Sequence, residues 1–317
     1  MSVLSIPYFH DEALAVEKLE SLVWPNGPVC PKCGEKNRIG RLNGTSTKIG
    51  TRKCYACRKK FTVTVGTVFE DSHIPVHQWL QVVHLMCASK KGISSHQLMR
   101  IMEVQYKTAW FMTHRIREAM KEGSWQAIGP LGGEGYTIEA DETYVGGKAA
   151  NRAFGPIPPK QAVMALVERG GRVRSFHVPN VTANNLAPII ARHTHEDSQF
   201  MTDESNVYTH PGRWFVSHQT VNHSEKEYVR GDAFTNTIEG YFSILKRGIY
   251  GVYQHVSEAH LGRYLAEFDF RYSYRVKTGY NDMARMDRAL AGIVGKRLTY
   301  RLPSGARSAA SSLQARA

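Results

Sequence analysis

Apolar residues recur with helical spacing along most of the first 125 residues. Residues 9–24 follow this pattern, and Asp11 stands where the N-cap of a helix is expected. The stretch "WPNGP" then interrupts the pattern. Residues 75–123 hold three further segments of the same kind, with Pro75 suited to the first turn of the first one. We predict a helix for each of these segments: "PVHQWLQVVHLMCAS", "GISSHQLMRIM" and "YKTAWFMTHRIREAMKE".

After the glycine-rich residues 129–135 the pattern changes to the alternation that is typical of strands. A strand, a hairpin turning at Gly170 and Gly171, a helix, two more strands and a helix follow in order. This order favours a mixed α/β fold of the RNase H-like kind. Two C-terminal helices and a basic tail complete the chain. The α/β part comprises a strand (136–147), the hairpin (161–181), a helix (182–194), two strands (198–205 and 215–224) and a helix (235–249).

Four of the five cysteines form two pairs with the same spacing. Cys30 and Cys33 are separated by two residues, as are Cys54 and Cys57, and twenty residues lie between the pairs. Two such knuckles can direct four thiolates at one ion, which is typical of a closed, structural Zn²⁺ site. A redox role for one pair would leave the other unexplained. We therefore predict one structural zinc ion in a zinc ribbon whose last strand is residues 59–69.

Positive charge is concentrated around the cysteines. The chain has a formal net charge of +13, and residues 30–60 contain ten Lys or Arg and a single acid, Glu35. This balance favours a polyanionic partner such as nucleic acid, although it also serves solubility alone. No apolar run approaches the roughly 20 residues of a membrane span, and the N-terminus lacks a signal-peptide pattern. We expect a cytoplasmic protein with no membrane partner.

The predicted helices of residues 75–123 have the proportions of a helix-turn-helix unit. A short helix capped by Ser94 or Ser95 is joined through "EVQY" to a longer basic helix. An ordinary three-helix bundle with solvated charges is equally compatible with the pattern. The fifth cysteine, Cys87, lies in an apolar segment and is expected to be a small core residue. Candidate DNA contacts in the ribbon and in this unit are Lys53, Lys59, Lys60, Lys107, Arg115 and Arg117.

Three carboxylates stand at positions of the RNase H-like part where packing does not require them. Asp141 lies within the first strand, on the same face as Glu139. Asp203 ends a later strand, and Glu239 lies on the predicted helix 235–249. Adjacent strands of an RNase H-like sheet would bring Asp141 and Asp203 together, and the helix would supply the third acid. Taken alone, each of them is more often a surface or strand-end residue.

A cluster of carboxylates is either protonated or neutralised by metal. Ligand sets made of oxygen alone select Mg²⁺ or Mn²⁺. Two such ions about 4 Å apart can activate a water or a 3′-hydroxyl and stabilise the leaving oxygen in phosphodiester chemistry. Lys246 follows Glu239 by two helical turns, so both project from one face. A lysine there can hold a DNA backbone, although most lysines are simply solvated.

Over about residues 10–275 the chain resembles one known family of enzymes. The segments "WPNGPVCPKCG", "IEADETYVGGK", "MTDES", "VNHSEKEYV" and "TNTIEGYFSILKRGIYGVYQHVSEAHLGRYLAEFDFRYSYR" resemble the bacterial insertion-sequence DDE transposases that carry an N-terminal zinc ribbon, the ISXO-type group. The resemblance implies that Asp141, Asp203 and Glu239 are the catalytic, metal-binding triad, and that Lys246 is the basic residue after the triad glutamate. The 35 residues between Asp203 and Glu239 match the spacing typical of such enzymes.

One position departs from the family pattern. The family has a histidine before the "TNT" turn, where this chain has Phe234. His223 is a candidate to take over its role, although a structural histidine is the simpler interpretation. Asn236 is an alternative third ligand, because some related enzymes use asparagine there. We prefer Glu239 for its charge and its lysine partner.

These observations predict a multidomain α/β protein. The expected division is an N-terminal helix plus zinc ribbon (1–70), a helical DNA-binding region (71–128), an RNase H-like catalytic domain (129–275), and a C-terminal helix with a disordered basic tail (276–317). The resemblance implies a nucleoid-associated transposase that binds terminal inverted repeats and target DNA, with Lys246 and Arg247 as further contacts. Cleavage and strand transfer would use Mg²⁺ or Mn²⁺, as two ions, and a homodimer or larger assembly.

Two other functions remain open. The chain is alternatively a non-catalytic zinc-ribbon DNA-binding regulator, against which the three intact acids argue. It is alternatively an RNase H-like nuclease or resolvase that cleaves without joining.

Overall fold

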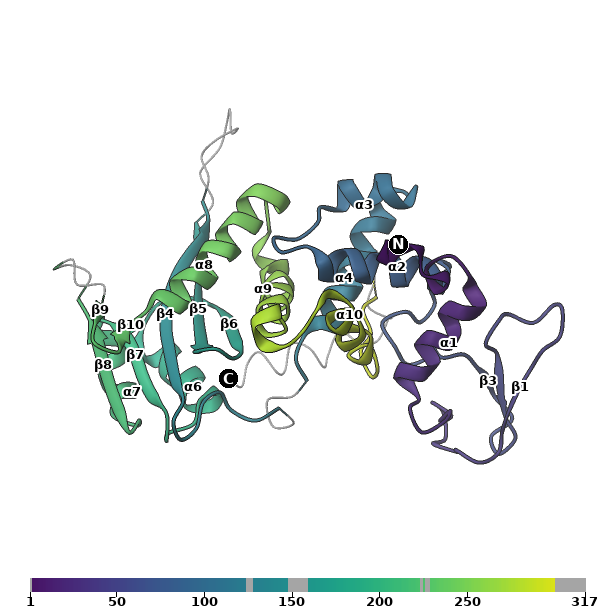
Figure 1. Ribbon diagram of the computed structural model, residues 1–317, viewed down its shortest axis with the longest axis horizontal. Helices are drawn as coiled ribbons and strands as arrows, with labels where there is room; N and C mark the ends of the chain where they lie inside the picture. The colour runs from purple at the N-terminus through teal and green to yellow at the C-terminus, as the bar shows by residue number, and fades with distance from the viewer. Residues whose placement is uncertain (1, 124–127, 148–158, 223–224, 226–228, 300–317) are drawn as a thin grey trace.

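The computed structural model describes residues 2–123, 128–147, 159–222, 225 and 229–299. The molecule is elongated, with a small sheet at one end, a large sheet at the other, and helices from both halves of the chain between them (Figure 1). None of the helices in the described residues combines the length and the apolar character that are needed to cross a membrane.

The small sheet holds the cysteine-rich segment. It consists of the antiparallel strands β1 (Ile39–Arg41), β2 (Arg52–Cys54) and β3 (Lys60–Phe61) in that order. The predicted last strand over residues 59–69 is wrong beyond Phe61. After Phe61 the chain turns, and Val68 then bonds to the carbonyl of Ile293, so this segment packs against the C-terminal part of the chain instead of extending the sheet.

The central helices are α1 (Glu12–Val23), α2 (Val76–Ala88), α3 (Ser95–Met102), α4 (Tyr106–Met120) and α10 (Asp282–Ala291). The predicted caps are confirmed, because Asp11 accepts a bond from the Leu14 amide and Ser94 accepts one from the Gln97 amide. The α3–α4 turn places Glu103 in the left-handed region, at φ 52°.

One apolar core joins all five of these helices and the end of α9 (Glu258–Ser273). Its members include Leu19 of α1, Leu80 of α2 and Leu290 of α10. The first and last helices of the chain therefore share the core of the unit that the sequence assigns to residues 71–128.

The large sheet has the order β6-β5-β4-β7-β8. The first three strands in sequence are antiparallel neighbours, whereas β7 runs parallel to both β4 and β8. This mixed sheet confirms the predicted RNase H-like α/β arrangement. The strands are β4 (Thr137–Gly146), β5 (Lys160–Glu168), β6 (Val173–Val178), β7 (Gln199–Asp203) and β8 (Ser217–Val221).

Helices cover both faces of this sheet because its strands alternate between two apolar cores. Val163 and Val167 of β5 pack with α8 (Asn236–Gly248) and α9 on one face. Met164 and Leu166 pack with α6 (Ala183–His193) on the other. Short elements connect these parts: η1 (Val3–Ser5), η2 (Pro7–Phe9), η3 (Asn206–Tyr208), α7 (Thr209–Gly212), β9 (Val229–Arg230), β10 (Ala233–Phe234), η5 (Ile249–Tyr253) and η6 (Val276–Thr278).

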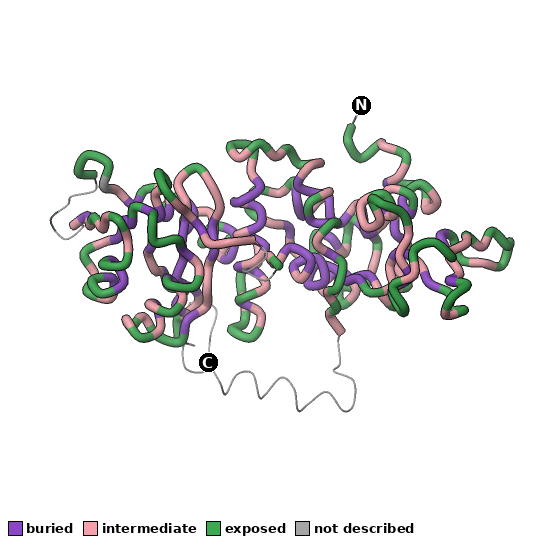
Figure 2. The backbone as a smooth tube through the Cα atoms, turned by 90° about the horizontal axis from the view of Figure 1, so that it is seen from below, coloured by how far each residue is buried: buried purple, intermediate pink, exposed green. Residues whose placement is uncertain are grey.

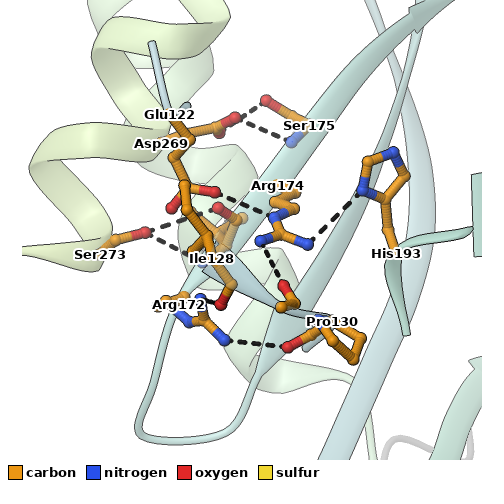
Figure 3. Close-up of polar contacts among 11 residues, drawn as sticks. Glu122, Ile128, Pro130, Arg172, Arg174, Ser175, His193, Asp269 and Ser273 are labelled. Atoms are coloured by element: carbon orange, nitrogen blue, oxygen red, sulfur yellow. Dashed lines mark hydrogen bonds and ion pairs between the residues drawn. The ribbon is translucent and has the colours of Figure 1, made fainter. Parts of the chain in front are cut away.

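A polar junction fastens the glycine-rich connection to the sheet (Figure 3). Arg174 of β6 donates to Glu122 at 3.0 Å and to the carbonyl of Gly129 at 2.8 Å. Arg172 donates to the carbonyls of Ile128 and Pro130. Because these bonds tie the chain after α4 to an edge strand, the connection holds the helical core and the sheet in a defined relation.

Candidate functional site

The four paired cysteines meet at the tip of the small sheet. Their sulfur atoms all lie within 4.8 Å of one another, with 3.7 Å from Cys30 to Cys57 and 3.6 Å from Cys33 to Cys54. Within the described chain, this is the one group of three or more potential ligands gathered so closely. Four sulfur ligands at these distances fit a single tetrahedral Zn²⁺.

Backbone amides prepare the first knuckle for metal. Burial opposes ionisation of Cys30, but the amides of Lys32 and Cys33, together with the thiols of Cys33 and Cys57, bond its sulfur and lower the pKa of that thiol to about 7. The fifth cysteine, Cys87, is fully buried in the helical core, and burial raises its pKa to about 12. It is the core residue that the sequence predicts.

The ribbon has little else to hold it. Its apolar cluster contains three buried residues, Cys30, Cys54 and Phe61, two of which are ligands. Figure 2 shows that this end of the molecule is largely exposed or intermediate, in contrast to the purple interior of the sheet and the helices. An ion pair of 2.6 Å between Arg52 and Glu20 anchors the ribbon to α1.

The second candidate site lies where β4, β7 and α8 meet. The parallel register pairs Ile138 with Phe200 and Glu139 with Met201. Continued by two residues, the same offset sets Asp141 level with Asp203, and residues that are level in parallel strands point to the same face of the sheet. The predicted neighbourhood of these two acids therefore follows from the sheet.

The glutamate of α8 completes this group. Glu239 lies in the first turn of the helix and accepts a hydrogen bond from the Thr235 hydroxyl at 3.3 Å. Burial, together with the negative charges of Glu142, Asp203 and Glu239, raises the pKa of Asp141 to about 7. Asp203 and Glu239 thus both act electrostatically on Asp141, and this repulsion favours a bound cation.

A fourth acid, Glu142, belongs to the same cluster and was not singled out from the sequence. Its carboxylate accepts a bond from the Tyr208 hydroxyl at 2.6 Å, and burial raises its pKa. Burial and this neighbouring carboxylate raise the pKa of Tyr208 well above its usual value. The signal was present in the run "EADE", in which Glu142 directly follows Asp141.

A buried carboxylate fixes α8 relative to β4. Glu139 is fully buried and accepts bonds from the Ile238 amide at 2.9 Å and from Arg169 at 2.7 Å. It therefore supplies the cap that the side chain of Thr235 does not give this helix. Since Glu139 lies two residues from Asp141 on the same face of β4, it positions the acid-bearing turn of α8 over the sheet.

Phe234, the position that departs from the family pattern, lies beside this cap. The Arg169 guanidinium lies 3.6 Å from the centre of the Phe234 ring and donates to the Phe234 carbonyl at 2.7 Å. The aromatic side chain therefore helps to hold the turn before α8. His223, the candidate substitute, lies outside the described residues. Asn236 is exposed at the start of α8.

The candidate DNA contacts divide into two groups. Lys59, Lys60, Lys107, Lys246 and Arg247 are exposed, and the half-buried Lys53 lies over the ring of Tyr55. Arg115 and Arg117 are different and require a correction, treated next.

Arg115 and Arg117 are buried and are not available to DNA. Arg117 pairs with the buried Glu267 at 2.7 Å and lies 3.9 Å from the ring centre of Tyr264. Arg115 donates to the carbonyl of Glu70. The two side chains lie roughly 200° apart around α4, so this stretch of the helix is buried on more than one side, which charge alone does not reveal.

Known protein families agree with this layout. Residues 10–60 match the transposase zinc-ribbon domain, and residues 130–273 match the ISXO2-like transposase domain. A curated protein of Halobacterium salinarum, described as an uncharacterized protein in the transposable element ISH50, is similar at 25% identity over 288 residues, which are 85% of this chain and 93% of that protein. The chain therefore consists of a transposase zinc-ribbon domain followed by an ISXO2-like transposase domain, the organisation of an ISXO2-like transposase with an N-terminal zinc ribbon.

Proposed function

We propose that this chain binds the terminal inverted repeats of an insertion sequence and catalyses metal-dependent cleavage and strand transfer at its ends. The observation that carries the proposal is the acidic cluster of β4, β7 and α8, in which Asp203 and Glu239 help to raise the pKa of Asp141. Such a cluster destabilises the metal-free fold and is therefore expected to serve a function.

Asp141, Asp203 and Glu239 would hold Mg²⁺ or Mn²⁺ as two ions. The donor set fits, because it offers oxygen atoms only and its net charge is negative. When bound, the ions supply Lewis acidity for activation of a water or 3′-hydroxyl and for stabilisation of the leaving oxygen. Glu142 adds negative charge beside Asp141, and Glu139 orients the helix that carries Glu239.

The chain's own cations would hold the DNA. Lys246 is exposed two turns beyond Glu239 on α8, so it can grip a phosphate next to the reacting one. Arg247 follows it and bonds the Ser243 hydroxyl at 2.8 Å, which limits its freedom. The exposed Lys59 and Lys60 of the ribbon and Lys107 of α4 would bind phosphates further along the end sequence. A dimer or larger assembly would bring two ends together.

The test is an assay of cleavage and strand transfer on a labelled duplex that carries the element's end, with Mg²⁺. We expect joined products with the wild type and none with Asp141→Asn, while both bind the end. Asp197→Asn, an exposed acid outside the cluster, serves as the matched control and should retain activity. Cleavage without joining would favour a nuclease. Tight binding with no cleavage in Mg²⁺ or Mn²⁺ would favour a non-catalytic regulator and sink the proposal.

A further inference from the structure

The two strands that carry Asp141 and Asp203 stop pairing with each other before they reach these acids. The last pair of the parallel ladder between β4 and β7 joins Glu139 to Met201, and each acid lies two residues further along its strand. From there β4 continues in its pairing with β5, and β7 continues in its pairing with β8. The ladder therefore sets the two acids level but does not itself fix the distance between their carboxylates.

A chain of hydrogen bonds leads from one carboxylate to the other. Oδ1 of Asp203 accepts from the Ser205 amide at 3.1 Å, and the Ser205 carbonyl accepts from the Tyr208 amide at 3.2 Å. The Tyr208 hydroxyl donates to Oε2 of Glu142 at 2.6 Å. The Glu142 amide donates to Oδ1 of Asp141 at 2.7 Å. We call these four bonds, with the residues that they join, the tether.

The bond between Tyr208 and Glu142 is the step of the tether that crosses from the segment after β7 to β4. Tyr208 is fully buried, and its ring packs edge-on against Phe200, with 6.3 Å between the ring centres. Packing therefore fixes the place of the hydroxyl. A length of 2.6 Å is typical of a hydroxyl that donates to a carboxylate, which is among the stronger hydrogen bonds of proteins.

Glu142 points away from the side of the sheet on which metal would bind. Side chains alternate along β4, so Asp141 lies on the face that packs against α8. Glu142 lies on the other face with Ala140, which belongs to the same apolar core as Tyr208. Its carboxylate is thus directed at the tyrosine, whereas its backbone amide bonds the neighbouring aspartate.

We propose that Tyr208 and Glu142 are positioning residues, which set the separation and the orientation of Asp141 and Asp203 for metal binding. Because the tether holds Oδ1 of each aspartate, it limits the rotation of both carboxyl groups. Mg²⁺ accepts little deviation from octahedral geometry at about 2.1 Å, so a shift of about 0.5 Å in either carboxylate should weaken its binding. The inference rests on the proposed function and adds the residues that hold its metal site in shape.

Two substitutions separate the tether from the charge of Glu142. Tyr208→Phe removes the hydroxyl and keeps the ring that packs beside Phe200. Glu142→Gln removes the charge and keeps an oxygen that can accept the bond from Tyr208. The matched control is Tyr253→Phe, because the Tyr253 hydroxyl also donates to a carboxylate at 2.6 Å, that of Glu267, outside the acidic cluster.

The first measurement is Mn²⁺ binding to the full-length, zinc-loaded protein without DNA, followed by the electron paramagnetic resonance signal of free Mn²⁺. Asp141→Asn identifies the part of the binding that belongs to the acidic cluster. We expect Tyr208→Phe to weaken this part roughly tenfold. Glu142→Gln should weaken it by a clearly smaller factor, and Tyr253→Phe should leave it unchanged.

The second measurement is the Mg²⁺ concentration that gives half-maximal cleavage of the labelled end. It should rise in Tyr208→Phe by a factor similar to the loss of Mn²⁺ affinity, and excess Mg²⁺ should restore much of the rate. A general loss of folding would not be restored in this way. The thermal unfolding of Tyr208→Phe and Tyr253→Phe shows what each lost bond costs the fold.

A further variant breaks the tether at its other end. Ser205→Pro removes the amide that donates to Asp203, at a φ of −64° that proline itself adopts. It should weaken Mn²⁺ binding as Tyr208→Phe does, and it decides the question should Tyr208→Phe fail to fold.

Two results would overturn the proposal. One is wild-type Mn²⁺ affinity in a folded Tyr208→Phe. The other is a loss in Glu142→Gln as large as that in Tyr208→Phe, which would assign the effect to the charge of Glu142. If the wild type shows no Mn²⁺ binding that depends on Asp141, the proposed function fails together with this inference, so the wild type tells the two failures apart.

Discussion

The surroundings of Asp141 in the acidic cluster disfavour the ionised form of its carboxyl group. Burial and three neighbouring acids raise its pKa from 3.8 to about 7. The folded state therefore keeps a proton that the unfolded chain releases above about pH 4, and the corresponding stability is lost as the pH rises through 7. At pH 8 the metal-free protein thus holds an ionised Asp141 at a cost.

We predict that Asp141→Asn stabilises the metal-free protein at pH 8. The gain should be on the order of 1 kcal/mol, after allowance for the partial exposure of the side chain. Denaturant unfolding without added metal measures it, and Asp197→Asn is the control. Added Mg²⁺ should raise the stability of the wild type and not that of Asp141→Asn. A less stable variant would show that this carboxylate is not strained.

Glu139 should matter for stability as well as for the site. Glu139→Gln leaves the charge of Arg169 without its partner and weakens the cap at the start of α8. We expect a loss of about 2–4 kcal/mol in the free energy of unfolding and a large loss of strand transfer. The exposed Glu134 provides the control variant Glu134→Gln. Unchanged unfolding of Glu139→Gln would mean that this carboxylate does not hold the helix.

Single residues mark the limit of what the sequence can predict. The three acids follow from a strand pattern and a helix pattern, so their positions were predictable. Arg115 and Arg117 were predicted to bind DNA because they are basic, but the partner that buries Arg117 is Glu267, 150 positions away. Likewise, nothing local in the sequence indicates that the ring of Phe234 lies against Arg169.

Among the elements, the zinc ribbon should be the one that depends on metal. Its core is three residues, and two of them are ligands, so metal binding and folding of residues 25–66 are coupled. We predict that Cys30→Ser makes this segment sensitive to protease while the rest of the chain stays protected, because α1 packs into the helical core. Binding of the DNA at the end of the insertion sequence should weaken. A ribbon in Cys30→Ser that resists protease as the wild type does would contradict the coupling.

The junction between α8, α9 and β6 should give a pH dependence of its own. Asp269 of α9 accepts a bond from the hydroxyl of Ser175 (Figure 3). It also accepts one from the hydroxyl of Tyr241, and burial raises its pKa to about 7. The folded state again binds the proton more tightly than the unfolded state. Stability should therefore fall by up to about 1.4 kcal/mol per pH unit between pH 4 and 7.

Asp269→Asn should remove this slope. Asp141 contributes a similar one, but its share should vanish in saturating Mg²⁺, so the two are separable by unfolding at several pH values with and without Mg²⁺. A slope that persists undiminished in Asp269→Asn with Mg²⁺ would assign the proton to another group.

Elements were easier to predict than their lengths. Side-chain caps at Asp11 and Ser94 and the glycine turn at 170–171 are local signals, and the structure follows them. The strand over residues 59–69 failed because its alternation of apolar residues serves a different purpose. Val68 and Phe69 enter the helical core, whose other side is supplied by residues more than 200 positions later.

At the scale of the whole molecule, the last described helix packs against the first two α-helices of the chain. The last described helix, α10, packs on α2 and α1, and Lys18 of α1 pairs with Asp287 of α10 at 2.9 Å. A division of the chain into consecutive segments does not anticipate this packing, because periodicity shows that a helix has an apolar face but not which partner covers it. The helical core therefore depends on residues that flank the large sheet in sequence.

This packing predicts the effect of a truncation. A chain that ends at Tyr280 loses Met286, Leu290 and Ile293, all fully or almost fully buried in the helical core. The helical core should unfold, while the sheet keeps its own two apolar cores. Hydrogen exchange resolved by segment measures this as lost protection in α2 and α4 with retained protection in β4 and β5. Leu290→Ala in the full chain should give a graded form, about 2–5 kcal/mol less stable. A truncated chain with fully protected α2 would show that the helical core stands without α10, and the predicted division at residue 276 would then describe the folding units after all.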